Sequence, residues 1–124
     1  MKFSTKHHRH LYKKMFKRNK KTLTKIHKEA AKNPWEYGHG TEYLVAFMKF
    51  MYEYYTLGEN VWQSDESLQE VKDTLKEALD AYHDWQSFDY FAQEGDVEKY
   101  NNEYNRRRER FFKLLSDNIE KWWD

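Results

Sequence analysis

Four arginines crowd one short stretch of the chain, Arg106-Arg-Arg-Glu-Arg110. A guanidinium group offers a planar fork of N–H donors, which fits a carboxylate or a phosphate through two parallel hydrogen bonds. Arg108 also falls on the apolar face of the helix expected here, and a buried charge must be paired. The stretch therefore predicts either an ion pair that fixes helix register, with Glu53 as the expected partner, or a site that grips an anionic ligand.

Histidines offer a second kind of chemistry, the binding of a metal ion. Three of them stand near the start of the chain, His7, His8 and His10. Their spacing is loose and the segment is close to a terminus, so a solvated tail is the favoured interpretation. Glu36-x-x-His39 and Asp80-x-x-His83 have the spacing of the carboxylate-x-x-His pairs in di-iron bundles. Two glycines disfavour a helix around the first pair, and the second pair lies off the apolar stripe of its helix, so we expect no metal site.

No arrangement typical of an enzyme stands out. There is no Gly-x-Ser-x-Gly turn, no glycine-rich phosphate loop and no dinucleotide fingerprint. The chain has no cysteine, which excludes disulfides and thiolate chemistry. We therefore expect a protein without catalytic residues and without a cofactor.

Helices must position these side chains, and the first predicted helix is long and basic. It runs from about Thr5 or Lys6 to Lys32, because Asn33 precedes Pro34 and the residue before a proline avoids the α conformation. Its apolar stripe recurs at steps of four and three residues, which is one face of a helix. The stripe consists of Tyr12, Phe16, Asn19, Leu23, Ile26 and Ala30, widened by Leu11 and Met15.

The stretch 43–57 is the most apolar part of the chain. Of its fifteen residues, only three are clearly polar: Lys49, Glu53 and Thr56. A helix that is apolar around nearly its whole circumference must lie inside a bundle or inside a membrane. A membrane span needs about 20 apolar residues, so this shorter and charged stretch predicts a buried central helix that begins near Thr41 and ends at Leu57.

The third predicted helix has a clear start signal, the capping box Ser67-x-x-Glu70, although Ser64 or Asp65 would begin it one turn earlier. Its end falls between residues 86 and 93. The apolar stripe steps by three and four residues. The stripe consists of Leu68, Val71, Leu75, Ala78, Tyr82 and Trp85.

A last helix is expected after Gly95, with Asp96 as its cap, and reaches about Trp122. Its inward stripe consists of Val97, Tyr100, Tyr104, Arg108, Phe111, Leu115, Ile119 and Trp122. Short connections favour antiparallel neighbours. We therefore predict an all-α fold, an antiparallel bundle of about four helices around the buried central helix, formed by residues 1–124 as a single domain.

The net charge of +1 hides a division of charge along the chain. Residues 1–33, the basic N-terminal helix, hold twelve Lys and Arg against one acid, whereas residues 34–124, the acidic helical body, hold ten against twenty acids. The basic helix is expected to dock on the body or on a second copy, to follow a nucleic-acid backbone, or to lie on an anionic membrane surface. Asn19 within its stripe is typical of a polar residue that sets helix register. The cations concerned include Lys13, Lys14, Lys17, Arg18, Lys20 and Lys21.

Three motifs carry a resemblance to a known group of proteins. They are the turn Pro34-Trp-Glu-Tyr-Gly, the stretch Tyr54-Tyr-Thr-Leu-Gly-Glu-Asn-Val-Trp62, and the ending Asn118-Ile-Glu-Lys-Trp-Trp-Asp124. Together they resemble small helical proteins of unknown role encoded by tailed bacteriophages of gut bacteria. The resemblance covers most of the chain, including the basic first helix. It implies a viral origin and brings no catalytic residues.

The favoured hypothesis is a non-enzymatic phage binding protein in the cytoplasm of an infected bacterial host. It would sequester an anionic, nucleotide-like ligand to counter host defence, with arginines for phosphate and aromatic rings for a base. The expected ligand-binding residues are Arg106, Arg107, Arg108, Arg110, Trp35, Tyr37, His39, Lys17 and Lys20. A homo-oligomer is expected, with no membrane span. The alternatives are a nucleic-acid-binding module that uses the basic N-terminal helix, and a partner-blocking protein inhibitor.

Overall fold

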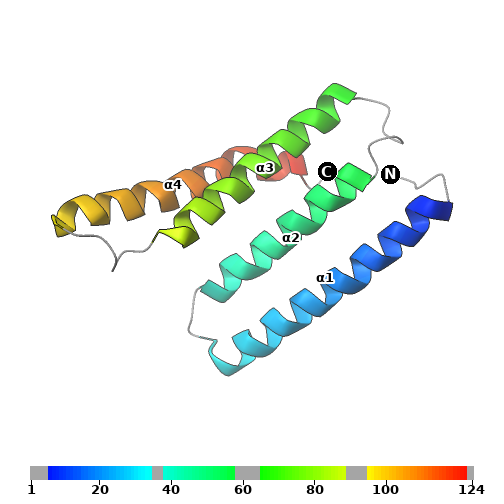
Figure 1. The fold of residues 1–124 in the computed structure, drawn as a ribbon, viewed down its shortest axis with the longest axis horizontal. Coiled ribbons are helices and arrows are strands. Elements are labelled where there is room, and N and C mark those ends of the chain that lie inside the picture. Colours follow the sequence, from blue (N-terminus) through cyan, green and yellow to red (C-terminus); the bar gives the residue numbers. More distant parts are fainter. Residues whose placement is uncertain (1–5, 35–37, 58–64, 89–94, 123–124) are drawn as a thin grey trace. The chain divides into compact units, whose positions relative to one another are not determined.

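The computed structural model describes residues 6–34, 38–57, 65–88 and 95–122, and within them it contains four α-helices and no strand (Figure 1). The helices are α1 (Lys6–Lys32), α2 (Gly38–Leu57), α3 (Asp65–Ser87) and α4 (Val97–Trp122). The prediction of an all-α fold with four helices is confirmed. The chain divides into two compact units, Met1–Lys72 and Asp73–Asp124, each of which is described by itself.

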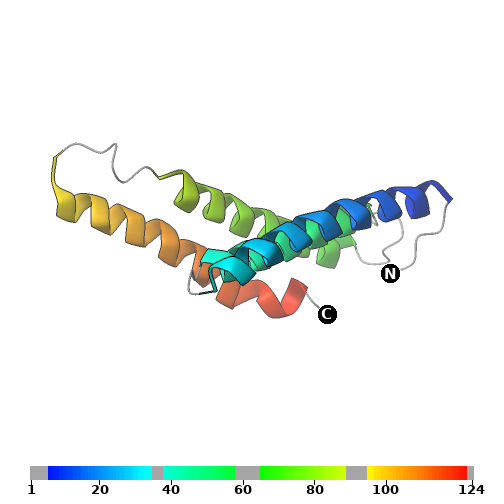
Figure 2. The ribbon, with the colours of Figure 1, turned by 90° about the horizontal axis from the view of Figure 1, so that it is seen from below.

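In the first unit, α1 and α2 lie side by side and antiparallel, as both ribbon views show (Figures 1 and 2). Met15 of α1 is buried, and Tyr12 meets Tyr54 of α2 edge to face, with 5.7 Å between the ring centroids. Arg18 of α1 forms an ion pair with Glu53 of α2. One apolar edge of α1 is therefore held against α2.

One residue of α1 differs from the expected stripe. Phe16 is 52% exposed, so its placement on the inward stripe was wrong, and the adjacent Met15 takes the buried position. Apolar periodicity cannot separate two neighbouring residues when both are apolar. Asn19 is half-buried but donates its side-chain N–H to the carbonyl oxygen of Met15 at 2.9 Å, within its own helix.

α2 begins at Gly38, three residues before the predicted start at Thr41, and it ends at Leu57 as predicted. Glycine disfavours the interior of a helix, but the first turn has amides without intrahelical partners and tolerates it better. Four of its residues are buried, whereas Phe47 is 44% exposed. The buried four are Val45, Ala46, Met48 and Tyr55. A place for α2 at the centre of all four helices stays a prediction.

The ends of α3 and α4 follow from local signals. α3 starts at Asp65, the earlier of the two predicted starts, and ends at Ser87. Gly95 has a φ of 106°, a left-handed conformation that glycine adopts without strain. Asp96 then accepts a hydrogen bond from the backbone N–H of Glu98 at 3.0 Å, as a helix N-cap does. The predicted cap of α4 is confirmed.

In the second unit, α3 and α4 pack through aromatic rings. Phe111 is fully buried, with ring centroids 5.3 Å from Tyr82 and 6.0 Å from Trp85. Trp122 is also fully buried and donates its indole N–H to the hydroxyl oxygen of Thr74 at 2.9 Å. Trp122, at the end of α4, thus contacts Thr74, whereas Phe111, in the middle of α4, contacts Trp85 near the end of α3. The two helices are therefore antiparallel.

Two positions of α4 depart from the predicted stripe. Val97 is 61% exposed, so its inward placement was wrong, because periodicity does not tell how far a facing helix reaches. Asn118 is buried although polar. Its side-chain N–H donates to the carbonyl oxygen of Leu114 at 2.8 Å, which satisfies the donor inside the helix.

Adjacent phenylalanines of α4 provide a test of this packing. Replacing the fully buried Phe111 by Ala removes a ring from the centre of the aromatic contacts and should cost about 3–5 kcal/mol of the free energy of unfolding. Phe112, 43% exposed, is the matched control, and Phe112→Ala should cost clearly less. Urea denaturation followed by circular dichroism measures both. Equal losses would contradict the packing described for α4.

Candidate functional site

Two of the arginines in the 106–110 stretch share one carboxylate. Arg106 donates two hydrogen bonds to Glu103, one from Nε at 3.0 Å and one from Nη2 at 2.7 Å. Arg107 donates from Nε to the same carboxylate at 2.9 Å. A second donor of Arg107, Nη1, reaches the backbone carbonyl oxygen of Asp84 in α3 at 2.8 Å. The donors that would grip a ligand are thus largely engaged within the α3–α4 pair.

The remaining arginines also have neighbours in the second unit. Arg110 lies 3.5 Å from the carboxylate of Asp84, and the half-buried Arg108 lies over the ring of Tyr104, 6.0 Å from its centroid. The expected partner of Arg108, Glu53, forms its ion pair with Arg18. The contacts favour a structural role for this cluster, while its role as an anion site stays a prediction.

The hydrogen bonds from Arg106 and Arg107 lower the pKa of Glu103 from 4.5 to about 2. The same contact raises the pKa of Arg106. Both shifts favour the charged forms of the two partners. The carboxylate therefore stays ionised at neutral pH, and its low pKa makes it a poor general acid or base there.

A groove of about 1080 Å³ runs along this end of the α3–α4 pair. Phe88 lies on one side of it, with the guanidinium carbon of Arg107 5.0 Å from the ring centroid. The lining holds three cations and two carboxylates, so its charge nearly balances. The lining residues are Ser87, Phe88, Gly95, Asp96, Lys99, Tyr100, Asn102, Glu103, Arg106 and Arg107.

The other predicted site residues lie in the first unit. Trp35 and Tyr37 fall outside the described residues. His39 lies in the first turn of α2, where both of its ring nitrogens are shielded from solvent. Lys17 and Lys20 are exposed on α1. The structure therefore places Arg106, Arg107, Arg108 and Arg110 together on α4, and it does not test whether the residues of the two units form one site.

α1 carries a dense group of exposed cations, which we call the basic face. Its members form no ion pair with any described residue, in contrast to Arg106, Arg107 and Arg110 of α4. They are Arg9, Lys13, Lys14, Lys17, Lys20, Lys21, Lys25 and Lys28. Two further cations of α1 do have partners: Arg18 pairs with Glu53, and Lys32 lies 3.9 Å from Glu29.

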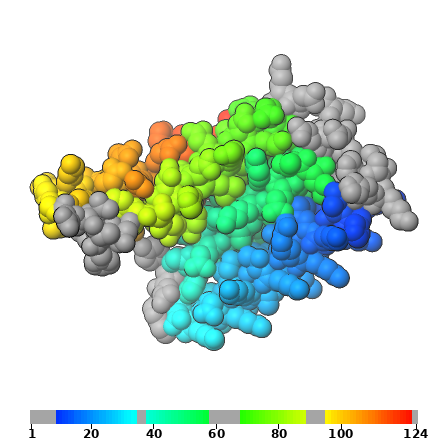
Figure 3. Space-filling view, viewed as in Figure 1, coloured from blue at the N-terminus to red at the C-terminus, as the bar shows by residue number. Residues whose placement is uncertain are grey.

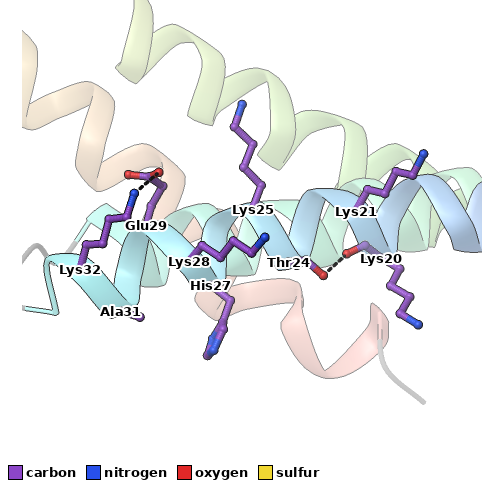
Figure 4. Close-up of a pocket in the computed structure, with 9 residues that line it drawn as sticks. All are labelled: Lys20, Lys21, Thr24, Lys25, His27, Lys28, Glu29, Ala31 and Lys32. Atoms are coloured by element: carbon purple, nitrogen blue, oxygen red, sulfur yellow. Dashed lines mark hydrogen bonds and ion pairs between the residues drawn. The ribbon is translucent and has the colours of Figure 1, made fainter.

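The basic face is open rather than enclosed. A shallow hollow of about 770 Å³ lies along it, and all nine of its lining residues, from Lys20 to Lys32, belong to the one helix. Figure 4 shows Lys20, Lys21 and Lys25 projecting away from the helix in different directions. The space-filling view shows α1 at the surface along its length (Figure 3). Such a face suits an extended ligand better than a small one held in a pocket.

Comparison with protein-family models, with curated proteins and with solved structures found no significant match. Among the described residues, no group of three or more His, Cys, Asp or Glu is placed to hold a metal ion. No helix in the same ranges is long and apolar enough to cross a membrane.

Sequence reasoning missed several of these residues. Glu103 precedes Arg106 and Arg107 by three and four residues, which is the spacing of ion pairs on one helix face, so this signal was available. Asp84 lies 23 residues before Arg107, and no local pattern indicates such a contact. Lys25 and Lys28 extend the predicted basic surface toward the end of α1.

The lowered pKa of Glu103 predicts a pH dependence of stability. A carboxyl whose pKa is lower in the folded state stabilises the fold above its unfolded pKa, and this contribution is lost as pH falls from about 4.5 toward 2. Glu103→Gln should therefore destabilise the protein at pH 7, and the difference from wild type should shrink over that range. Urea denaturation at several pH values measures the difference.

The matched control is Glu109→Gln, since Glu109 is exposed on the same helix and forms no ion pair with a described residue. Glu109→Gln should change the free energy of unfolding little at any pH between 7 and 2. A gap between wild type and Glu103→Gln that stays constant from pH 7 to pH 2 would mean that the two arginines do not stabilise the ionised carboxylate.

Proposed function

We propose that the protein is a non-enzymatic binding protein that holds nucleic acid by its phosphate backbone on the basic face of α1. The observation that carries this proposal is the group of eight exposed cations without an ion-pair partner among the described residues. A cation already matched to a carboxylate gains little from a phosphate, whereas a solvated lysine gains the free energy of released counterions. Among the described residues, the largest group of exposed cations without an ion-pair partner lies on α1.

The spacing of the basic face supports an extended polyanion. From Arg9 to Lys28 the helix axis rises about 30 Å, at about 1.5 Å per residue. Eight cations over that length give roughly one per 4 Å of helix axis, which is comparable with the one phosphate per about 3.4 Å of axis on each strand of duplex DNA. A single nucleotide would reach only a few of them. A strand or duplex would engage most of the face.

The composition of the face also indicates the mode of recognition. Lysine is a point charge on a flexible stem and contacts phosphate without a fixed orientation. Binding should therefore depend strongly on salt and weakly on base sequence. A phage origin, suggested by the resemblance of the sequence motifs, is compatible with nucleic-acid binding in an infected host. We also propose that the protein forms a homo-oligomer.

A second candidate function is the capture of a nucleotide-like anion in the groove of the α3–α4 pair. It is favoured by the presence of Phe88, Tyr100, Arg106 and Arg107 in one lining, which offers rings for a base and guanidinium groups for phosphate. It ranks second because both guanidinium groups already bind Glu103. A ligand would have to compete with that carboxylate.

Neutralising three cations of the basic face tests the first candidate. The variant Lys17→Gln, Lys20→Gln, Lys21→Gln should bind labelled DNA more weakly. The slope of log K against log salt should become shallower by about 2 to 3, at 0.7 to 0.9 per lost phosphate contact. Fluorescence anisotropy at several salt concentrations measures both quantities.

The control variant carries the same loss of charge elsewhere: Lys76→Gln, Lys99→Gln, Lys113→Gln in α3 and α4. Its affinity and its slope should stay close to those of wild type. If wild type binds neither duplex nor single strands at about 50 mM salt, the proposal is wrong. A melting temperature raised by mononucleotides in that same case would favour the groove.

A further inference from the structure

One large aromatic ring stands on the surface of α1 instead of inside the protein. Phe16 is 52% exposed. An isolated exposed apolar residue is common on protein surfaces and needs no function. The position of this ring makes it informative, because it lies on the most positively charged helix of the chain, at the edge of the basic face.

Cations lie on one side of Phe16 at helical spacing. Lys13 precedes it by three residues and Lys20 follows it by four, and residues so spaced are neighbours on one side of a helix. Lys17 is next to it in sequence and is also exposed. A phosphate backbone held by these lysines would bring its bases within reach of the ring.

The ring is also supported from behind. Its centroid lies 6.5 Å from that of Tyr12, with 32° between the ring planes. Tyr12 in turn contacts Tyr54 of α2 edge to face. Tyr12 packs in the α1–α2 contact and so gives the exposed ring of Phe16 one aromatic neighbour on its own helix.

We infer that the basic face binds single-stranded nucleic acid, with an unpaired base stacked on Phe16 while Lys13, Lys17 and Lys20 hold the flanking phosphates. This inference rests on the proposed function and narrows it. Bases inside a duplex are stacked on both faces, whereas an unpaired base of a single strand can place one flat face against an aromatic ring. Stacking on aromatic rings tolerates any base, as the lysine contacts do.

The test compares Phe16→Ala and Phe16→Leu with wild type on single-stranded and duplex 20-mers of matched sequence, followed by fluorescence anisotropy. Leucine keeps an apolar side chain but removes the aromatic ring. Both variants should weaken single-strand binding about fivefold or more, and duplex binding should change less than about twofold. Oligomers of thymidine and of uridine in parallel distinguish DNA from RNA as the natural ligand.

Phe112→Ala on α4 is the matched control, since Phe112 is a second exposed phenylalanine, 43% exposed, outside the basic face. It should leave both affinities unchanged. Phe16→Trp adds a direct readout. This variant should retain single-strand affinity, and oligothymidine should quench the additional tryptophan fluorescence that the variant shows over wild type.

Three results would overturn the inference while the proposed function stands. They are unchanged single-strand affinity in both Phe16 variants, an equal loss for duplex and single strand, and a loss of affinity that accompanies a fall in molecular mass, which would make Phe16 a contact between copies. Failure of wild type to bind either form would instead defeat the proposed function itself. The two failures are therefore distinguishable.

Discussion

The narrow apolar edge of α1 determines which of its many charges remain in water. Met15 is buried against the rest of the first unit, and Leu23 and Ile26 are half-buried along the same edge. A helix can bury one stripe without burying the lysines on its other sides, because each ammonium group would need a partner there. With a single acid in 27 residues, α1 cannot neutralise its own cations.

The two groups of cations in this chain are treated differently by the fold, and the reason is chemical. The arginines of α4 have planar forks that match carboxylates, and Glu103 and Asp84 are placed to receive them. The lysines of α1 lie on one side of a helix that offers only Glu29. Glu53 of α2 is a second acidic residue near α1, and it forms its ion pair with Arg18. The cations of α1 that form no ion pair with a described residue make up the basic face.

Much of the local structure could be predicted from the sequence. The end of α1 follows from Pro34 and the start of α4 from the cap at Asp96, because both act through the backbone of their immediate neighbours. The start of α2 at Gly38 could not be predicted from the sequence. Glycine has a low helix propensity, so tertiary contacts decide where this helix begins.

The candidate site was less predictable. Lys17 and Lys20 were expected on the surface from their charge alone, and they are exposed. The partners of the arginines depend on which residues of α3 face α4, and the exposure of Phe16 depends on a choice between two adjacent apolar residues. Both are set by packing between helices, for which the sequence pattern carries no direct signal.

Lysine acetylation footprinting tests the central claim most directly. The protein would be treated with a limiting acetylating reagent with and without an oligonucleotide, and the modified lysines would be located by mass spectrometry. Nucleic acid should protect the seven lysines of the basic face, whereas Lys99 and Lys113 of α4 should be modified equally in both samples. The seven are Lys13, Lys14, Lys17, Lys20, Lys21, Lys25 and Lys28. Protection confined to α4, or no protection on α1 under conditions where the oligonucleotide is bound, would contradict it.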